Sequence, residues 1–148
     1  MASVDEKTGP YRHLKLIYSG EATQLFKARD ERNGRLVALK RLRGGSDKGR
    51  NVTEQMRREV QMTSLLPEKK FFIEIFEMGK EGGIPYLVME WFPAPNVGQL
   101  INLGYENYAP VLPALIPLLF EPLVPLHDAG VVHRDIKPDN FLYSPISV

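Results

Sequence analysis

Residues 131–142 limit the possible fold and chemistry of this chain more tightly than any other segment. The apolar ends, Val131-Val132 and Phe141-Leu142, flank a polar centre, and this pattern predicts a strand–loop–strand unit. The centre holds Asp, Pro and Asn, which form turns readily, so a solvated turn would explain any isolated pair of them. The ordered run over residues 133–140 needs a more specific explanation, because a long motif arises by chance far less often than a short one.

This run, His133-Arg134-Asp135-Ile136-Lys137-Pro138-Asp139-Asn140, resembles the catalytic loop of protein kinases at every fixed position of the pattern H-R-D-[LI]-x-x-x-N. The resemblance implies that Asp135 orients the substrate hydroxyl and accepts its proton, and that Asn140 binds Mg²⁺ beside the phosphates of ATP. It also implies that Lys137 neutralises charge on the transferring phosphate. A lysine at that position is the form typical of serine/threonine kinases.

A second motif, Val37-Ala38-Leu39-Lys40, is similar to the V-A-I-K strand of the same family. Strand alternation puts Ala38 and Lys40 on one face. The resemblance implies that adenine lies against Ala38 and that Lys40 reaches the α- and β-phosphates. Such a lysine needs a counter-charge, and Glu59 in a predicted helix is the expected partner. Taken singly, Lys40 could be an ordinary strand lysine and Glu59 a solvated helix residue.

The phosphate-binding loop departs from the family pattern. The resemblance places Tyr18, Gly20 and Thr23 at the three glycine positions of G-x-G-x-x-G, and only Gly20 is a glycine. Glycines there let backbone N–H groups approach phosphate closely. We therefore expect a weakened nucleotide lid, in which Ile17 and Leu25 still cover the adenine.

The segment Tyr86-Leu87-Val88-Met89-Glu90-Trp91-Phe92 resembles the fifth strand and hinge of the family. The resemblance implies that Met89 is the gatekeeper and that backbone groups of Glu90 and Phe92 hydrogen-bond adenine. Leu142 would close the floor of the pocket. Core packing is the ordinary explanation for that leucine, and we expect it in either case.

Local patterns predict the elements around these motifs. Strands flank Asn33-Gly34 and residues 79–83 as two hairpins. A helix is predicted after the loop at residues 44–47, with Asn51 as its cap and its apolar face at Val52, Met56 and Val60. Residues 110–129 favour a kinked or broken helix, because three of their prolines remove backbone donors from its middle.

We therefore expect an α+β chain with a protein-kinase-like two-lobed fold. Residues 1–10 would be a flexible tail, and residues 11–92 an N-lobe built from an antiparallel β-sheet with helix C. Residues 93–148 would hold the hinge exit and the incomplete start of a mainly helical C-lobe with the catalytic loop. The family's Asp-Phe-Gly is absent from the eight residues after Asn140. We therefore expect a kinase domain truncated after the catalytic loop, with little or no activity of its own.

The composition limits the classes of partner that we expect this chain to bind. A formal net charge of +1 gives no general attraction for nucleic acid or membranes. The absence of cysteine excludes disulfides and thiolate metal sites and fits a cytoplasmic location. Residues 111–126 are strongly apolar, but they contain four prolines and Glu121, so we expect no membrane helix. Another chain could cover the apolar C-lobe surface that the missing helices would leave open.

Three functions remain open from the sequence. The first is a serine/threonine protein kinase that uses ATP and Mg²⁺ to phosphorylate a protein hydroxyl. The second is a pseudokinase-like module that binds nucleotide or regulates a partner, which the altered glycine loop and the missing Asp-Phe-Gly would fit. The third is a small-molecule phosphotransferase of the kinase-like superfamily, although Arg134 and Lys137-Pro138-Asp139 favour the protein-kinase form.

Overall fold

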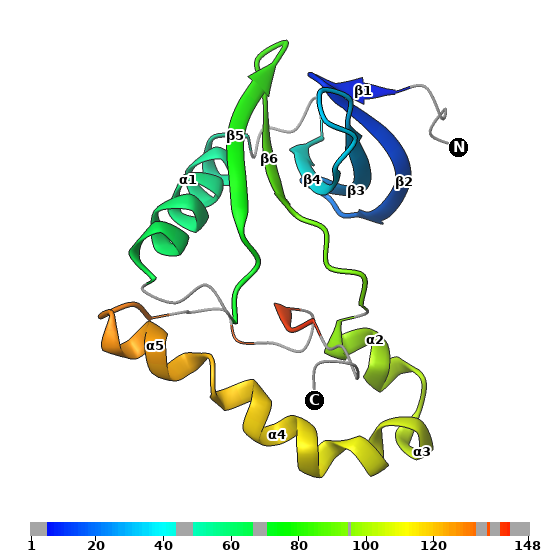
Figure 1. The fold of residues 1–148 in the computed structure, drawn as a ribbon, viewed down its shortest axis with the longest axis vertical. Helices are drawn as coiled ribbons and strands as arrows, with labels where there is room; N and C mark the ends of the chain where they lie inside the picture. The colour runs from blue at the N-terminus through cyan, green and yellow to red at the C-terminus, as the bar shows by residue number, and fades with distance from the viewer. Residues whose placement is uncertain are drawn as a thin grey trace. The chain divides into compact units, whose positions relative to one another are not determined.

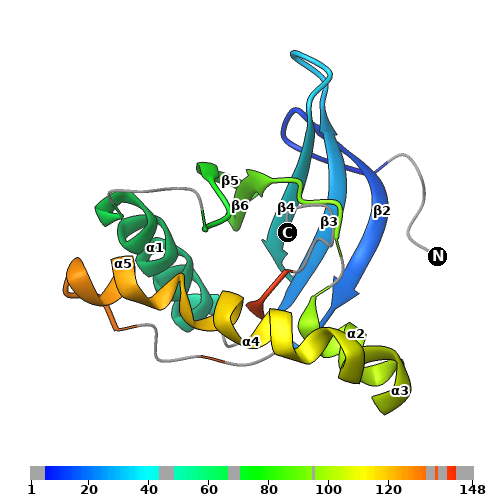
Figure 2. The same cartoon turned by 60° about the horizontal axis from the view of Figure 1, so that its bottom comes forward.

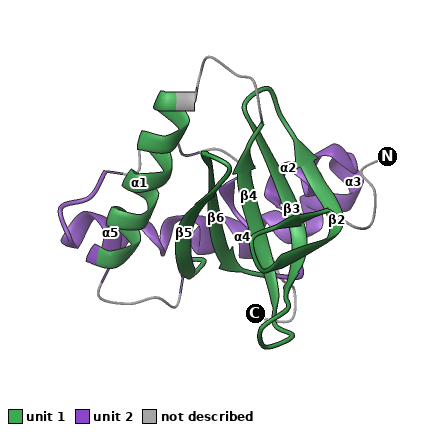
Figure 3. Cartoon of the chain, turned by 90° about the horizontal axis from the view of Figure 1, so that it is seen from above, with its two compact units in different colours: residues 1–64, 73–91 green, residues 65–72, 92–148 purple. Residues whose placement is uncertain are grey.

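A computed structural model describes residues 6–43, 49–66, 71–94, 96–132, 136 and 140–142. The chain forms two compact units, which Figure 3 distinguishes by colour. Unit 1 comprises residues 1–64 and 73–91, and unit 2 comprises residues 65–72 and 92–148. The predicted N-lobe ran without interruption over residues 11–92, whereas residues 65–72 pack with unit 2.

Unit 1 is built on a six-stranded sheet in which every neighbouring pair is antiparallel (Figure 1). The strand order is β1-β2-β3-β4-β6-β5. The strands are β1 (Lys7–Thr8), β2 (Tyr11–Ser19), β3 (Thr23–Asp30), β4 (Leu36–Leu42), β5 (Ile75–Glu81) and β6 (Ile84–Glu90). Helix α1 (Gly49–Leu65) lies between β4 and β5 in the chain and beside β5 and β6 in space (Figure 2).

Both predicted hairpins are present. Gly82 and Gly83 connect β5 to β6 with φ values of 55° and 78°, the positive angles that a two-residue hairpin turn needs. The connection between β3 and β4 is longer than the two-residue Asn33-Gly34 turn that the sequence predicted. Hydrogen bonds to the backbone and side chain of Asp30 hold this longer turn. The Asp30 carbonyl accepts the Gly34 N–H at 2.7 Å, and the Asp30 carboxylate accepts the Arg32 N–H at 3.0 Å.

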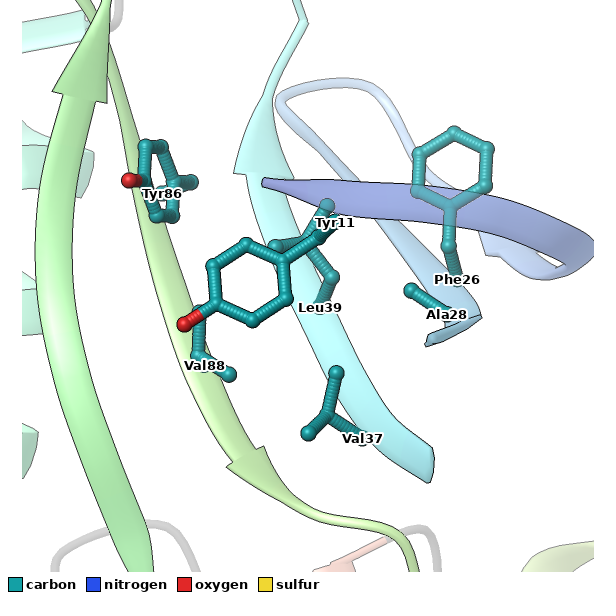
Figure 4. Packing of buried hydrophobic residues seen from close by; sticks show 7 residues of the cluster. All are labelled: Tyr11, Phe26, Ala28, Val37, Leu39, Tyr86 and Val88. Carbon is teal, nitrogen blue, oxygen red and sulfur yellow. The ribbon is translucent and has the colours of Figure 1, made fainter. Parts of the chain in front are cut away.

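The main core of unit 1 lies on the sheet face opposite Lys40. Val37 and Leu39 alternate with Ala38 and Lys40 along β4, so strand geometry sends them to the other face. There they pack in one buried cluster (Figure 4), whose members are Tyr11, Phe26, Ala28, Val37, Leu39, Tyr86 and Val88. This cluster fixes the strands that carry the predicted nucleotide-binding residues.

A second cluster attaches α1 to the Lys40 face. Val52, Met56 and Leu87 are buried together, and Val60 packs against them. The predicted apolar face of the helix is therefore present. The predicted cap is wrong: α1 begins at Gly49, so Asn51 lies inside the helix.

Residues 7 and 8 are not part of a flexible tail, although the sequence predicted one over residues 1–10. Lys7–Thr8 form β1, which pairs with β2. The Glu6 carbonyl accepts the His13 N–H at 2.9 Å, and the Thr8 hydroxyl lies 2.9 Å from His13 Nε2. Gly9, with φ at 55°, and Pro10 form the tight turn between β1 and β2, a local signal that the prediction of a tail overlooked.

Unit 2 is helical. Its elements are α2 (Val97–Asn102), α3 (Tyr105–Tyr108), the 3₁₀ turn η1 (Ala109–Val111), α4 (Leu112–Phe120) and α5 (Leu123–Asp128). The break between α4 and α5 falls at Glu121-Pro122, which confirms the predicted interruption. Sequence reasoning missed α2, although Asn96 and Gln99 form a complete capping box at its start.

The apolar helices of unit 2 are mostly open to solvent within the described chain. Leu115 and Leu126 are buried, but Ile116 and Phe120 expose 48% and 64% of their surfaces. The stretch Tyr105–Asp128 is long and apolar enough to cross a membrane by length and composition alone, a test that core helices of soluble proteins also pass.

Candidate active site

The Lys40 side chain of β4 and the Glu59 side chain of α1 form an ion pair within unit 1. Lys40 Nζ donates to Glu59 Oε1 at 2.9 Å, and the two side chains are 26% and 34% exposed. The position of the helix explains the contact. Met56 is fully buried against Leu87, and Glu59 follows it by three residues, on the same side of the helix. The structure therefore brings together the two residues that the sequence predicted as partners.

The strand register places three other predicted nucleotide contacts, Leu25, Ala38 and Met89, on the Lys40 face. Ala38 pairs with Met89 on β6, and Lys40 pairs with Leu25 on β3. Directly opposite residues in antiparallel strands share a face. Ala38 is buried, and Met89 packs against the cluster that holds α1.

The backbone around the predicted hinge is partly committed to internal hydrogen bonds. The Glu90 N–H donates to the Glu74 carbonyl at 2.8 Å, and the Phe92 carbonyl accepts the Ala94 N–H at 2.8 Å. The adenine contacts of these two residues stay predictions. Trp91 stacks under the Lys27 ammonium, which lies 5.1 Å from its ring centroid.

The predicted nucleotide lid is the β2–β3 turn. The Gly20 N–H donates to the Thr23 carbonyl at 2.9 Å, and Arg43 Nη1 donates to the Gly20 carbonyl at 3.1 Å. Sequence reasoning missed Arg43, because nothing in the motif pairs the end of β4 with the lid. Ile17 is 39% exposed on β2, just before the turn.

The predicted catalytic residues Asp135 and Lys137 lie outside the described residues. Asn140 is described and exposed, and the two residues after it are joined to the start of α2. The Phe141 carbonyl accepts the Val97 N–H at 2.8 Å, and Leu142 forms an antiparallel bridge with Asn96. Leu142 is 43% exposed, so the expected core packing of this side chain is wrong.

The strand–loop–strand prediction for residues 131–142 also needs correction. Val131 and Val132 belong to no strand, and Leu142 contributes only the isolated bridge to Asn96. Among the described residues no three His, Cys, Asp or Glu side chains gather as a metal site. Asn140, the metal ligand predicted from the sequence, lies among the described residues.

The described groups with a shifted pKa lie away from the Lys40–Glu59 pair. Side-chain hydrogen bonds from Arg32 Nε at 2.9 Å and Nη2 at 2.8 Å hold the pKa of the Asp30 carboxyl below its ordinary value. Burial lowers the pKa of His13, and the nearby Arg41 lowers it further. Asp30 and His13 both lie in the sheet of unit 1 and are not among the predicted site residues.

Comparison with solved structures identifies the fold. The chain superposes on the structure described as "PpkA-294 apo form" with a TM-score of 0.79 and 18% sequence identity, over 99% of this chain and 58% of that one. The architecture is thus the α+β protein-kinase-like two-lobed fold, with an antiparallel β-sheet N-lobe and helix C.

The protein kinase domain family model matches residues 11–147, and this chain belongs to that family. It is 37% identical over 133 residues to the probable serine/threonine-protein kinase PknB of Corynebacterium glutamicum, covering 86% of this chain and 20% of that protein. It is 33% identical over 138 residues to the probable serine/threonine-protein kinase pknA2 of Bifidobacterium longum, covering 90% and 18%. The chain therefore spans about a fifth of the length of these relatives.

Proposed function

We propose that this chain is the ATP-binding part of a serine/threonine protein kinase, which transfers the γ-phosphate of ATP to a serine or threonine hydroxyl of a protein. The observation that carries the proposal is the Lys40–Glu59 ion pair, with Nζ and Oε1 2.9 Å apart. The pair lies on the sheet face that also holds Ala38 and Met89. A lysine held by a carboxylate beside a small buried residue suits a nucleotide whose base lies flat and whose phosphates need a cation.

In this proposal each residue has one task. Glu59 holds Lys40 in position, and Lys40 pairs with the α- and β-phosphates. Asp135 accepts the proton of the substrate hydroxyl as that oxygen attacks the γ-phosphorus, and Lys137 offsets charge on the moving phosphoryl group. Mg²⁺, when bound, neutralises charge between the phosphates, and Asn140 supplies an amide oxygen of the kind that this ion prefers.

The substrate and location are part of the same proposal. The names of the relatives, which are serine/threonine-protein kinases, support a protein substrate. The absence of cysteine supports a cytoplasmic setting. The net charge of +1 gives no reason to add nucleic acid or a membrane as a partner. Exposed apolar side chains on α4 support a further protein surface as a partner of unit 2.

Nucleotide binding by matched variants tests the proposal. We expect the chain to bind ATP with Mg²⁺ in isothermal titration calorimetry, and Lys40→Ala to weaken that binding by about tenfold or more, because a charged hydrogen-bond donor to phosphate is lost. Lys80→Ala, at an exposed position near the β5–β6 turn, is the control and should bind as the unaltered chain does. Equal ATP affinity in the Lys40 and Lys80 variants would overturn the proposal.

A further inference from the structure

Tyr18 lies in the same cross-strand row as Lys40. It pairs with Leu25 across β2 and β3, and Leu25 pairs with Lys40 across β3 and β4. Opposite residues share a face, so the Tyr18 side chain leaves the sheet on the side of the Lys40 ammonium. It is 59% exposed, so the hydrophobic core does not hold it in place.

The Tyr18 ring lies against the remaining lid glycine. A methyl group built on Gly20 would meet the Tyr18 hydroxyl oxygen at 2.6 Å and ring atom Cε1 at 2.9 Å. Both distances are well inside van der Waals contact, so the phenol occupies the space that the absent Gly20 side chain leaves open. A glycine normally leaves this space for a ligand to approach the backbone.

The Gly20 peptide groups are also engaged. The N–H donates to the Thr23 carbonyl, and the carbonyl accepts from Arg43 Nη1. A phosphate oxygen needs an N–H within about 3 Å to form a hydrogen bond. At Gly20 the donor is used inside the turn, and one side of the backbone is covered by a ring.

We propose that Tyr18 closes this lid against phosphate, so that the site holds a nucleotide through its base and Lys40 and gains little affinity from contacts between the lid and the phosphates. The inference rests on the proposed function, since it concerns how the same site binds its nucleotide. Tyr18 is thus a specificity-determining residue that makes the affinities for ATP and adenosine more alike than an open glycine lid would.

The test compares two ligands across three proteins. Calorimetry would give the affinities for ATP with Mg²⁺ and for adenosine in the unaltered chain, Tyr18→Gly and Tyr18→Phe. We expect Tyr18→Gly to raise the ratio of ATP affinity to adenosine affinity by about tenfold, the worth of one charged hydrogen bond to phosphate. Tyr18→Phe keeps the ring and should keep the original ratio.

The adenosine affinities distinguish a failure of this inference from a failure of the proposed function. An unchanged or lower ratio in Tyr18→Gly, with adenosine still bound, would overturn the role of Tyr18 and leave the proposed function standing. Failure of every protein to bind either ligand, with each one folded by circular dichroism, would overturn the proposed function and this inference with it. Tyr18→Ala provides the same test with less backbone freedom if the glycine variant does not fold.

Discussion

Met56 controls the position of α1, so its removal should affect both stability and the nucleotide site. Its side chain is fully buried between the helix and Leu87 on β6, and partly buried Ile75, Met78 and Met89 pack around this cluster. Met56→Ala removes most of that contact and leaves a cavity. Substitutions of this type cost about 2–5 kcal/mol. Domains are stable by about 5–15 kcal/mol, so a large share would be lost.

The same substitution should weaken ATP binding, although Met56 has no predicted contact with the nucleotide. Glu59 lies about one helical turn further along, and its pairing with Lys40 depends on the position of α1 against the sheet. Thermal unfolding followed by circular dichroism should show a midpoint lower by about 4 °C or more, given about 2–4 °C per kcal/mol in a chain of about 150 residues. Calorimetry on the folded protein at low temperature would give the ATP affinity.

Arg57→Ala is the matched control, because Arg57 is the next residue along the helix and its side chain is 59% exposed. It should change the midpoint by a small fraction of the effect at Met56. Equal midpoints and equal ATP affinities in the two variants would refute the reasoning that the buried face of α1 positions Glu59.

Two further predictions concern the Asp30 carboxylate of unit 1 and the exposed apolar side chains of α4 in unit 2. The pKa of Asp30 lies below its ordinary 3.8, so its contribution to stability is present above that pH and is lost as the pH falls through the lowered value. In the Asp30→Asn variant, the free energy of unfolding from chemical denaturation should therefore fall less as the pH is lowered into the acid range. An unchanged acid dependence would contradict this assignment. Ile116→Glu with Phe120→Glu should shift the chain from associated species to monomer in light scattering at micromolar concentration, and an unaltered mass distribution would count against the exposed patch.

Elements with local signals were predictable, whereas contacts between distant residues were not. Gly82-Gly83 and Pro122 act through their own backbone angles, so their turn and helix break could be read from the sequence. The hydrogen bond from Arg43 to the Gly20 carbonyl joins residues 23 apart and has no such signal. The Gly9-Pro10 turn between β1 and β2 does have one, which the prediction of a tail overlooked. The capping pattern at Asn51 was misleading, because the helix already begins two residues earlier, at Gly49.

The candidate site also contains features that the sequence predicted and features that it did not. Lys40 and Glu59 were expected to pair because their motif order resembled a family, and the fold supplies the geometry through Met56 and Leu87. The ring of Tyr18 over Gly20 could not be foreseen, because a tyrosine side chain can point in several directions from one strand position, according to its χ1 rotamer. The roles predicted for Asp135 and Lys137 stay predictions.

The bridge between Asn96 and Leu142 closes residues 97–141 into a loop whose two ends meet beside Asn140. Such a closure is entropically costly until the intervening helices have shortened the path between its ends. The local geometry of Asn140 should therefore form late in folding and be lost early when α4 or α5 is loosened. Substitutions in α4 or α5 would then disturb the Asn140 amide, the predicted metal ligand, through the chain's own connectivity.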